Sequence, residues 1–594
     1  MSDIDPHRID KRSARVISLQ QLNSFPAPQF VAALSGVFER TPWVAERVAA
    51  ARPFRSQLHL HQAMCAAVEQ AGIDEQLALI RAHPELSGRT RMRGELTPES
   101  AREQQGAGLA DCTPEESTRL QQLNAAYTQK FGFPFVLAIR GHDRASVIAA
   151  LERRVGNTVE HERAVALREI GRIAEFRLAE LVDEPLGPRI IAMAEELARL
   201  SDRADGLSCS YLTPAHRATA ALLREWMLGA GLEVEVDAVG NVIGRWRDAA
   251  ASARTLVTGS HYDTVIDAGK FDGRLGVLLP IVVVARLRGA GVRLPYTLTI
   301  VAFAEEEGVR FKSAFLGSRA LAGRFDPAVL DSVDADGITM RQAMVAAGLD
   351  PAAIPKAVLD PRTLLGFVEV HIEQGPVLLN EAVPLGIVTS IAGSTRCFVS
   401  ITGLAGHAGT VPMHLRRDAA AAAAEVVLAI EKRCGGTPGL VGTVGQLQVP
   451  MGAVNVIPGR CELSVDIRAD NDAVRDAAFA SVVAESARIA ARRQVEIQWR
   501  KVLEVACVPC APKMQQLWAD SIGRTTGNAE VRRLPSGAGH DAMVMGQITA
   551  MGMLFVRCGN GGISHHPSET LSAEDADVAA RAFQDFLLNF PVSP

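Results

Sequence analysis

The fold of most of this chain is decided by one stretch, Leu256-Val257-Thr258-Gly259-Ser260-His261-Tyr262-Asp263-Thr264-Val265. A short apolar run here gives way to glycine, histidine and aspartate, which is typical of a strand that ends in a loop. Further β-branched runs at 297–304 and 366–372 alternate with Ala-rich helical segments, and this order predicts an α/β sheet. Because open α/β sheets bind ligands at the carboxyl ends of their strands, we expect His261 to line a site.

The composition argues against nucleic acids and membranes as binding partners. The 594 residues carry a formal net charge of -5, and no Lys/Arg run offers a surface for nucleic acid or an anionic membrane. The sequence contains neither an apolar stretch of about 18 residues nor an N-terminal signal segment. Its odd number of scattered cysteines fits reduced thiols. We expect a cytoplasmic protein that acts on small molecules, without nucleic acid or membrane partners.

Three regions differ in pattern, which is expected for a chain of this length. Residues 1–182 predict an all-α domain that ends at the polar, proline-containing passage 183–188. Residues 183–392 and 506–594 predict an α/β catalytic domain. Between them, 393–505 contain strand-like runs at 397–403, 440–449 and 461–468 and helical runs at 418–433 and 473–493. This order predicts an inserted α+β lid or dimerisation subdomain, and hence a homodimer.

Metal-ligand residue types follow several of the predicted strands. They are Asp272 between glycines, the acidic run 305–307, His371 and His565, in addition to His261. Each residue alone is more typical of a structural role, but together they predict a metal site. Three adjacent carboxylates repel one another, and a divalent cation relieves that repulsion. Mixed imidazole and carboxylate ligands suit Zn, Mn or Co better than Ca.

Residues 190–594 resemble the amidohydrolase branch of the dinuclear metallopeptidases. This branch includes allantoate, ureidoglycolate and N-carbamoyl-amino-acid amidohydrolases and β-ureidopropionases. The resemblance rests on GSHYDTV, GKFDGRLGV, FAEEEGVRF, HIEQGP, AGHAGTVPM, NVIPG, DIR, SGAGHDA and GISHHPSE.

The resemblance implies a site for two divalent ions, Mn or Zn. Its ligands would be His261, Asp272 and His371, with Asp272 bridging, and Glu307 and His565 on the second ion. Glu306 would be the general base for a water whose pKa the ions lower, and Asp263 would orient His261. Because three glutamates are adjacent, a shift of these roles by one place within 305–307 stays open.

The same resemblance implies several substrate contacts. His407 would donate to the developing oxyanion and can belong to the site of the partner chain, while Arg468 would bind a substrate carboxylate. Arg396 and Asn455 would be further polar contacts. Taken without the resemblance, Arg468 is slightly more typical of an ordinary salt-bridge partner in a strand than of a substrate-binding residue. His540, with the glycines before it, would contribute lining.

In the helical N-terminal region, fewer residues indicate a function by their type and spacing. His83 precedes a proline, which disfavours helix at that residue, and Ser100, Glu103 and Gln104 are spaced to share one helix face. An apolar run follows at 131–139. A single histidine with a glutamate is more often structural than catalytic.

Residues 15–178 resemble the ureidoimidazoline (OHCU) decarboxylases through AHPEL, SAREQ, KFGFPFVLAIRG and ERRVGNTVEHERAVALREIGRIAEFRL. The implied reaction is cofactor-free loss of CO2 from 2-oxo-4-hydroxy-4-carboxy-5-ureidoimidazoline to give (S)-allantoin. His83 would be the proton donor, and Glu103 and Gln104 would hold polar substituents. The pocket would be completed by Pro84, Ser100, Phe135 and Ile139.

Together the two resemblances predict a bifunctional enzyme of urate and allantoin breakdown. A domain that makes allantoin favours allantoate over other ureides as the substrate of the second domain. Opening of the allantoin ring would need a separate allantoinase. Two alternatives stay open: an N-carbamoyl-L-amino-acid or β-ureidopropionate amidohydrolase, and a chain in which one domain is a non-catalytic assembly module.

Overall fold

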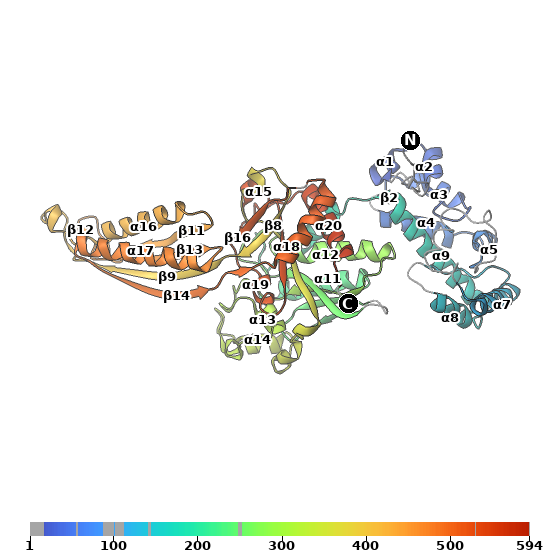
Figure 1. Ribbon diagram of the computed structural model, residues 1–594, viewed down its shortest axis with the longest axis horizontal. Coiled ribbons are helices and arrows are strands. Elements are labelled where there is room, and N and C mark those ends of the chain that lie inside the picture. The colour runs from blue at the N-terminus through green and yellow to red at the C-terminus, as the bar shows by residue number, and fades with distance from the viewer. Residues whose placement is uncertain are drawn as a thin grey trace, which may run out of the picture. The chain divides into compact units, whose positions relative to one another are not determined.

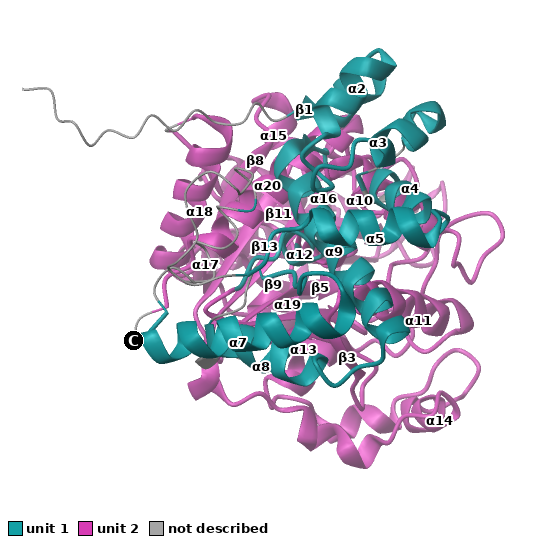
Figure 2. Ribbon diagram, turned by 90° about the vertical axis from the view of Figure 1, so that its right-hand side faces the viewer, with its two compact units in different colours: residues 1–185, 284–293 teal, residues 186–283, 294–594 magenta. Residues whose placement is uncertain are grey.

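The computed structural model describes residues 17–54, 57–86, 100, 112–139, 144–247, 252–528 and 530–592. The chain divides into two compact units, residues 1–185 with 284–293 and residues 186–283 with 294–594 (Figure 2). Every helix of the described residues is too short or too polar to cross a lipid bilayer.

The described part of the N-terminal region is mostly helical. Its α-helices are α1 (Leu19–Ser24), α2 (Ala27–Leu34), α3 (Trp43–Val48), α4 (Gln57–Glu69), α5 (Ile73–Ala82), α7 (Pro114–Phe131), α8 (Arg144–Arg154) and α9 (Val159–Leu181). Two short strands, β1 (Ile17–Ser18) and β2 (Val182–Asp183), pair in parallel, which the sequence pattern did not predict. The helices enclose one apolar core.

Within the predicted all-α domain, residues 144–181 form two helices, α8 and α9. The break falls at Gly156 and Asn157, which are poor helix formers. Thr158 then caps α9, because its side chain accepts a hydrogen bond from the N–H of His161. The Asn157 amide donates to Glu162 at 2.5 Å and stabilises the turn.

The larger unit contains a nine-stranded mixed sheet, in the order β15-β8-β17-β7-β5-β6-β4-β3 with β16 beside β8. Strands β8 and β16 of this sheet are labelled in Figure 1. The strands are β3 (Glu233–Val236), β4 (Val242–Trp246), β5 (Ser252–His261), β6 (Tyr296–Phe303), β7 (Leu364–Ile372), β8 (Leu385–Ile391), β15 (Val508–Pro509), β16 (Arg533–Ser536) and β17 (Met551–Val556). Strand β5 runs parallel to β6 and β7, and β7 runs parallel to β17. The carboxyl ends of these four strands therefore meet at one edge of the sheet.

Helices cover this sheet on its faces. The longer ones are α10 (Gly187–Ala198), α11 (Pro214–Gly229), α12 (Leu275–Gly289), α18 (Pro512–Thr526) and α20 (Ala573–Leu588). Shorter ones are α13 (Leu316–Leu321), α14 (Met340–Ala346), α15 (Val377–Asn380) and α19 (Asp541–Met545). All eight residues of β6 are buried, as expected for a central strand covered on both faces.

A separate antiparallel sheet forms between residues 393 and 505, in the order β11-β13-β9-β14. Its strands are β9 (Gly393–Thr402), β11 (Leu440–Gln448), β13 (Arg460–Ala469) and β14 (Glu496–Val505). Helices α16 (Ala419–Gly435) and α17 (Asp472–Arg493) pack on one face over an apolar core (Figure 1). Alternate residues of β13 are buried, so one face of the sheet stays open. Strands β10 (Gly406–His407) and β12 (Val456–Ile457) form a small ribbon.

Candidate metal centre and substrate site

The five predicted metal ligands lie together at the carboxyl edge of the large sheet. His261 ends β5, His371 lies one residue before the end of β7, and Glu307 follows β6. His565 lies in the segment after β17, and Asp272 lies just before α12. Because the strands are parallel, residues that are distant in sequence arrive at the same edge.

Asp272 stands at the centre of this cluster. Its Oδ1 atom lies 3.6 Å from Nε2 of His261 and 3.3 Å from Nε2 of His371. Its Oδ2 atom lies 3.2 Å from Nε2 of His565, which lies 3.4 Å from Oε1 of Glu307. The ligand atoms thus fall into overlapping groups, one with His261, Asp272 and His371 and another with Asp272, Glu307 and His565. One carboxylate is common to both groups.

The donor set fits a pair of divalent ions. Ligands about 2.1 Å from a tetrahedral ion lie about 3.4 Å from one another, close to the spacings above. Oδ1 of Asp272 is buried and has no hydrogen-bond partner among the described residues, although two imidazole nitrogens face it. The Nδ1 atoms of His261 and His371 contact the backbone oxygens of Asp263 and Ile372 at 3.1 and 2.8 Å. These contacts aim both Nε2 atoms at Asp272.

The electrostatics of the cluster also favour bound cations. Burial raises the pKa of Glu306 well above its usual range and raises that of Glu307 to about 7. Contact with Asp272 raises the pKa of His565 to about 9. The buried site therefore attracts positive charge, either as protons or as metal ions.

Asp263 contacts the acidic segment more directly than it contacts His261. Its carboxylate accepts hydrogen bonds from the backbone N–H groups of Glu306 and Glu307, at 3.0 and 3.1 Å. Its Oδ1 atom lies 3.4 Å from Nδ1 of His261, and that nitrogen is nearer to the backbone oxygen of Asp263. Asp263 thus fixes the loop after β6 as well as the imidazole.

Several polar residues around Asp272 were not singled out by the sequence analysis. Gln374 Nε2 donates to Oδ2 of Asp272 at 2.7 Å, and the Ser564 hydroxyl contacts the same oxygen at 2.6 Å. The buried carboxylate of Glu569 accepts from the backbone N–H of Asp272. All three lie inside the recognised motifs, but their spacing gives no sign of these contacts. The ring of His540 packs against His371, with centroids 4.5 Å apart.

The predicted arginines lie on the open face of the small sheet, at its end near residues 393 and 505. Arg396 on β9 is the cross-strand partner of Asp466 on β13, and both Arg396 and Arg468 contact the Asp466 carboxylate. Arg468 also donates to the backbone oxygen of Gly537 at 2.6 Å. These residues line a cavity of about 500 Å³. In this structure Arg468 is therefore a salt-bridge partner, at a cavity next to the loop that carries His540.

His407 and Asn455 lie together at the opposite end of the small sheet. The N–H of Ala408 donates to the backbone oxygen of Asn455, and β10 pairs with β12. Both side chains are exposed. Strand β9 covers about 26 Å between Ser394 and Thr402, at about 3.3 Å per residue. Within one chain, His407 and Asn455 therefore lie at the far end of the small sheet from Arg396 and Arg468.

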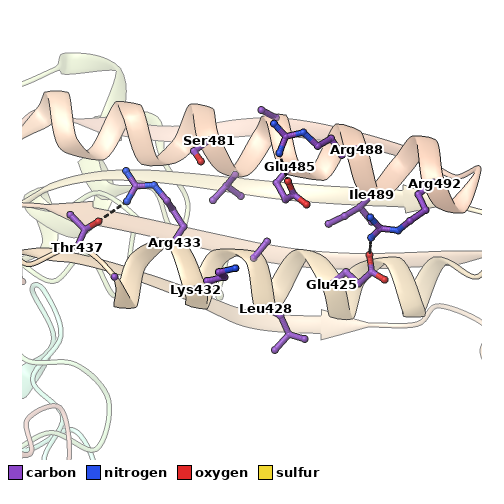
Figure 3. Close-up of a pocket in the computed structure, with 14 residues that line it drawn as sticks. Glu425, Leu428, Lys432, Arg433, Thr437, Ser481, Glu485, Arg488, Ile489 and Arg492 are labelled. Atoms are coloured by element: carbon purple, nitrogen blue, oxygen red, sulfur yellow. Dashed lines mark hydrogen bonds and ion pairs between the residues drawn. The ribbon is translucent and has the colours of Figure 1, made fainter.

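A groove of about 700 Å³ lies between α16 and α17 (Figure 3). Several of its charged side chains have polar partners on the same two helices or at their ends. Arg492 pairs with Glu425, Arg488 with Glu485 at 2.5 Å, and Arg433 donates to Thr437 at 2.6 Å. This groove is a charged helical surface rather than a reactive site.

The structure places His83 directly after α5, with an extended backbone before Pro84. The side chain is buried, and Nδ1 lies 3.1 Å from the backbone oxygen of Leu79. Nε2 has no hydrogen-bond partner among the described residues. Burial lowers the pKa of His83 to about 4. The ring is therefore neutral at pH 7, and it must take up a proton before it can donate one.

Ser100 belongs to a buried ionic group that the sequence analysis missed. Its hydroxyl donates to Glu39 at 3.0 Å, Arg177 pairs with the same Glu39 at 2.8 Å, and Arg177 also donates to Ser100. Pro84 is partly buried, and Phe135 and Ile139 are buried in the core. Glu103 and Gln104 lie outside the described residues.

Comparison with known proteins identifies two families in the chain. A model of peptidase family M20/M25/M40 matches residues 257–589, more than half of the chain. The chain belongs to this family. Residues 23–179 match the OHCU decarboxylase family and form an N-terminal domain of that kind. This member of the M20/M25/M40 family therefore also contains an N-terminal domain of a second enzyme family.

Relatives of the larger region include two kinds of enzyme. The N-carbamoyl-L-amino acid amidohydrolase of Geobacillus stearothermophilus is 40% identical over 395 residues, covering 66% of this chain and 96% of that protein. The allantoate deiminase of Arabidopsis thaliana is 38% identical over 426 residues, covering 67% of this chain and 81% of that protein. A solved amidase of the hydantoinase/carbamoylase family from Burkholderia multivorans has a TM-score of 0.64 and 33% identity, covering 68% of this chain and 97% of its own.

Proposed function

We propose that the chain is a bifunctional enzyme of ureide breakdown. Residues 1–182 would decarboxylate 2-oxo-4-hydroxy-4-carboxy-5-ureidoimidazoline to (S)-allantoin. Residues 183–392 with 506–594 would form the catalytic domain of an allantoate amidohydrolase, with 393–505 as its lid and dimerisation subdomain. The amidohydrolase assignment rests mainly on Asp272, which belongs to two neighbouring groups of imidazole and carboxylate ligands.

The metal centre would hold two Mn or Zn ions. His261, Asp272 and His371 would bind one, and Asp272, Glu307 and His565 the other, with Asp272 as the bridge. When bound, the ions supply Lewis acidity that polarises the carbamoyl oxygen and lowers the pKa of the attacking water. The residues discussed next would bind the substrate or transfer protons during hydrolysis.

Glu306 would be the general base. It is buried beside His261 and Glu307, where a carboxylate lies within reach of a water held by the two ions and can take its proton. The protonated Glu306 would then return this proton to the leaving amine. The carbamoyl group departs as ammonia and CO2, and allantoate becomes ureidoglycine.

Arg468 and Arg396 would bind the substrate carboxylate in the cavity beside Gly537. A carboxylate there can form charge-assisted hydrogen bonds with either guanidinium, in competition with Asp466. The cavity lies on the open face of the small sheet, next to the loop that carries His540.

His407 and Asn455 would serve the site of a second copy in a homodimer. Their ribbon lies at the end of the small sheet remote from Arg468, and it is surrounded by exposed apolar side chains: Leu404, Met413, Leu415, Met451 and Val454. Such a patch on an extended subdomain is typical of a protein interface. His407 would donate to the oxyanion that forms in the partner's site.

Allantoate is favoured as the substrate because the same chain carries a domain of the family that produces allantoin. A second candidate, an N-carbamoyl-L-amino acid, is supported by the 40% identity to the Geobacillus enzyme. Both share the carbamoyl group but differ in the side chain at the α-carbon. The test is ammonia release by the metal-loaded protein from allantoate and from N-carbamoyl amino acids, with faster turnover of allantoate expected.

In the decarboxylase, His83 would move a proton through Nε2. Because Nδ1 faces the oxygen of Leu79, Nε2 is the nitrogen that remains available to substrate. Loss of CO2 from the substrate carboxylate leaves an electron pair on the substrate, and His83, after taking up a proton from solvent at Nε2, would donate that proton to quench it. Glu103 and Gln104 would hold the ureido and hydroxyl groups, and no cofactor would be needed. The test is His83→Asn, which should abolish CO2 release.

A further inference from the structure

Glu569 is a buried carboxylate that joins two loops of the metal centre. It is 2% exposed. Its Oε1 atom accepts hydrogen bonds from the backbone N–H groups of Phe271 and Asp272, at 2.8 and 3.1 Å. Its Oε2 atom contacts the hydroxyl of Ser564 at 3.0 Å. One side chain therefore binds the loop that precedes α12 and the segment that precedes His565.

The same contacts extend to the predicted bridging ligand. The Ser564 hydroxyl lies 2.6 Å from Oδ2 of Asp272, the oxygen that faces His565. Glu569 thus reaches Asp272 by two routes, directly at its backbone N–H and, through the shared Ser564 hydroxyl, at its side chain. His565 is the neighbour of Ser564, so its position depends on the same contacts.

Close packing around Glu569 restricts the position of its carboxylate. A Cβ atom at Gly269 would lie 2.2 Å from the carboxyl carbon of Glu569, so glycine is required where the loop passes over the carboxylate. The backbone N–H of Glu569 also donates to the oxygen of His566 at 3.0 Å. The carboxylate is enclosed between the two loops.

We propose that Glu569 is a positioning residue for the metal centre, acting mainly on the ion held by Asp272, Glu307 and His565. The inference rests on the proposed dinuclear site. Contacts outside the ligand shell fix the orientation of metal ligands, and their loss lowers metal affinity on the order of 10- to 100-fold. Both Asp272 and His565 are fixed by Glu569, so this ion loses two oriented ligands when the carboxylate is removed.

Glu373 provides a matched control. It is also a buried glutamate, 8% exposed, and it also accepts two backbone N–H bonds, from Val377 at 2.7 Å and Leu378 at 2.9 Å. Within the described part of the chain, these bonds hold the start of α15 and reach none of the five predicted ligands. A purely structural role for Glu569 would make the two substitutions equivalent.

The test compares full-length wild type, Glu569→Ala, Glu569→Gln and Glu373→Ala. Each protein is loaded with Mn²⁺ and dialysed against a weak chelator, and bound Mn is counted by mass spectrometry. The melting temperature of each metal-free protein reports on the fold. If Glu569→Ala does not fold, Glu569→Asp, which withdraws the carboxylate by one methylene, replaces it.

We expect wild type and Glu373→Ala to keep two ions per chain and Glu569→Ala to keep one. Glu569→Gln should keep most of the second ion, because its amide oxygen can still accept from Phe271 and Asp272. Retention of two ions by Glu569→Ala, or equal loss in Glu373→Ala, overturns the inference and leaves the dinuclear site standing. A wild type that binds no pair of ions overturns the site itself.

Discussion

Nε2 of His371 lies 3.3 Å from Oδ1 of Asp272, a buried oxygen that forms no hydrogen bond within the part of the chain that the structure describes. The other oxygen of this carboxylate faces His565 at 3.2 Å. A carboxylate placed between two imidazole groups has the geometry of a bridging ligand, and burial makes it costly without a cation. The predictions for the larger domain depend on this arrangement.

Removal of metal should destabilise the protein. Without cations, the buried carboxylates of Asp272 and Glu306 stay close to the half-buried carboxylate of Glu307. Ligand linkage contributes about 2.7 kcal/mol when free metal exceeds its Kd 100-fold. We expect a chelator to lower the melting temperature and added Mn²⁺ or Zn²⁺ to restore it, while Ca²⁺ restores it poorly. An unchanged melting temperature would argue against a bound pair of ions.

Glu306→Gln should show whether Glu306 is the general base or a metal ligand. Glutamine keeps the shape of the side chain but takes up no proton, so we expect turnover to fall by about 10²- to 10⁴-fold. Metal content, measured by mass spectrometry, should stay at the wild-type value. Loss of metal from this variant would instead make Glu306 a ligand and shift the base within 305–307.

Mixed dimers should test whether His407 acts on the partner's site. His407→Ala and Glu306→Gln should each be nearly inactive alone. After random exchange of subunits, half of the dimers carry both chains, and one site in each has both intact residues. Activity should then recover to about a quarter of the wild-type value for a two-fold symmetric dimer. No recovery, with exchange verified by mass, would place His407 in its own chain's site or outside the chemistry.

His83→Asn should abolish decarboxylation and leave amide hydrolysis unchanged. Asparagine can still donate to the Leu79 oxygen but offers no imidazole nitrogen at the position of Nε2. CO2 release from the ureidoimidazoline and ammonia release from allantoate are measured on one preparation. Loss of both activities would contradict independent sites.

The N-terminal domain should lose stability as the pH falls from 6.5 to 4. Burial lowers the pKa of His83 to about 4, so the unfolded chain binds this proton first as the pH drops. The loss attributable to His83 is at most about 3 kcal/mol. Hydrogen exchange of peptides from α5 should show a smaller pH dependence in His83→Asn than in wild type. Equal pH dependence would mean that His83 does not titrate in this range.

The main elements could be predicted from sequence because their patterns are strong. Helices α16 and α17 and strands β5, β6 and β7 lie close to the predicted ranges. Strand β14 was missed, because it is an edge strand that carries Arg500, Lys501 and Glu504, and such charges weaken the apolar pattern. The break between α8 and α9 depends on local capping at Thr158, which an average over a long window conceals.

The candidate site was partly predictable for a similar reason. His261, Glu307 and His371 are visible in sequence because each follows or ends an apolar strand run. Glu569 and the Glu39–Arg177 pair carry no comparable pattern, since their partners are brought to them only by tertiary folding. Their roles, and those of the predicted ligands, stay predictions.

The central claim is that Asp272 and its neighbours form a dinuclear centre that hydrolyses allantoate. The most direct measurement is ammonia released from allantoate by full-length protein carrying a counted number of Mn²⁺ ions. We predict two ions per chain and a kcat/KM for allantoate above that for any N-carbamoyl amino acid tested. Full turnover of allantoate by metal-free protein, or preferred turnover of an N-carbamoyl amino acid, would contradict it.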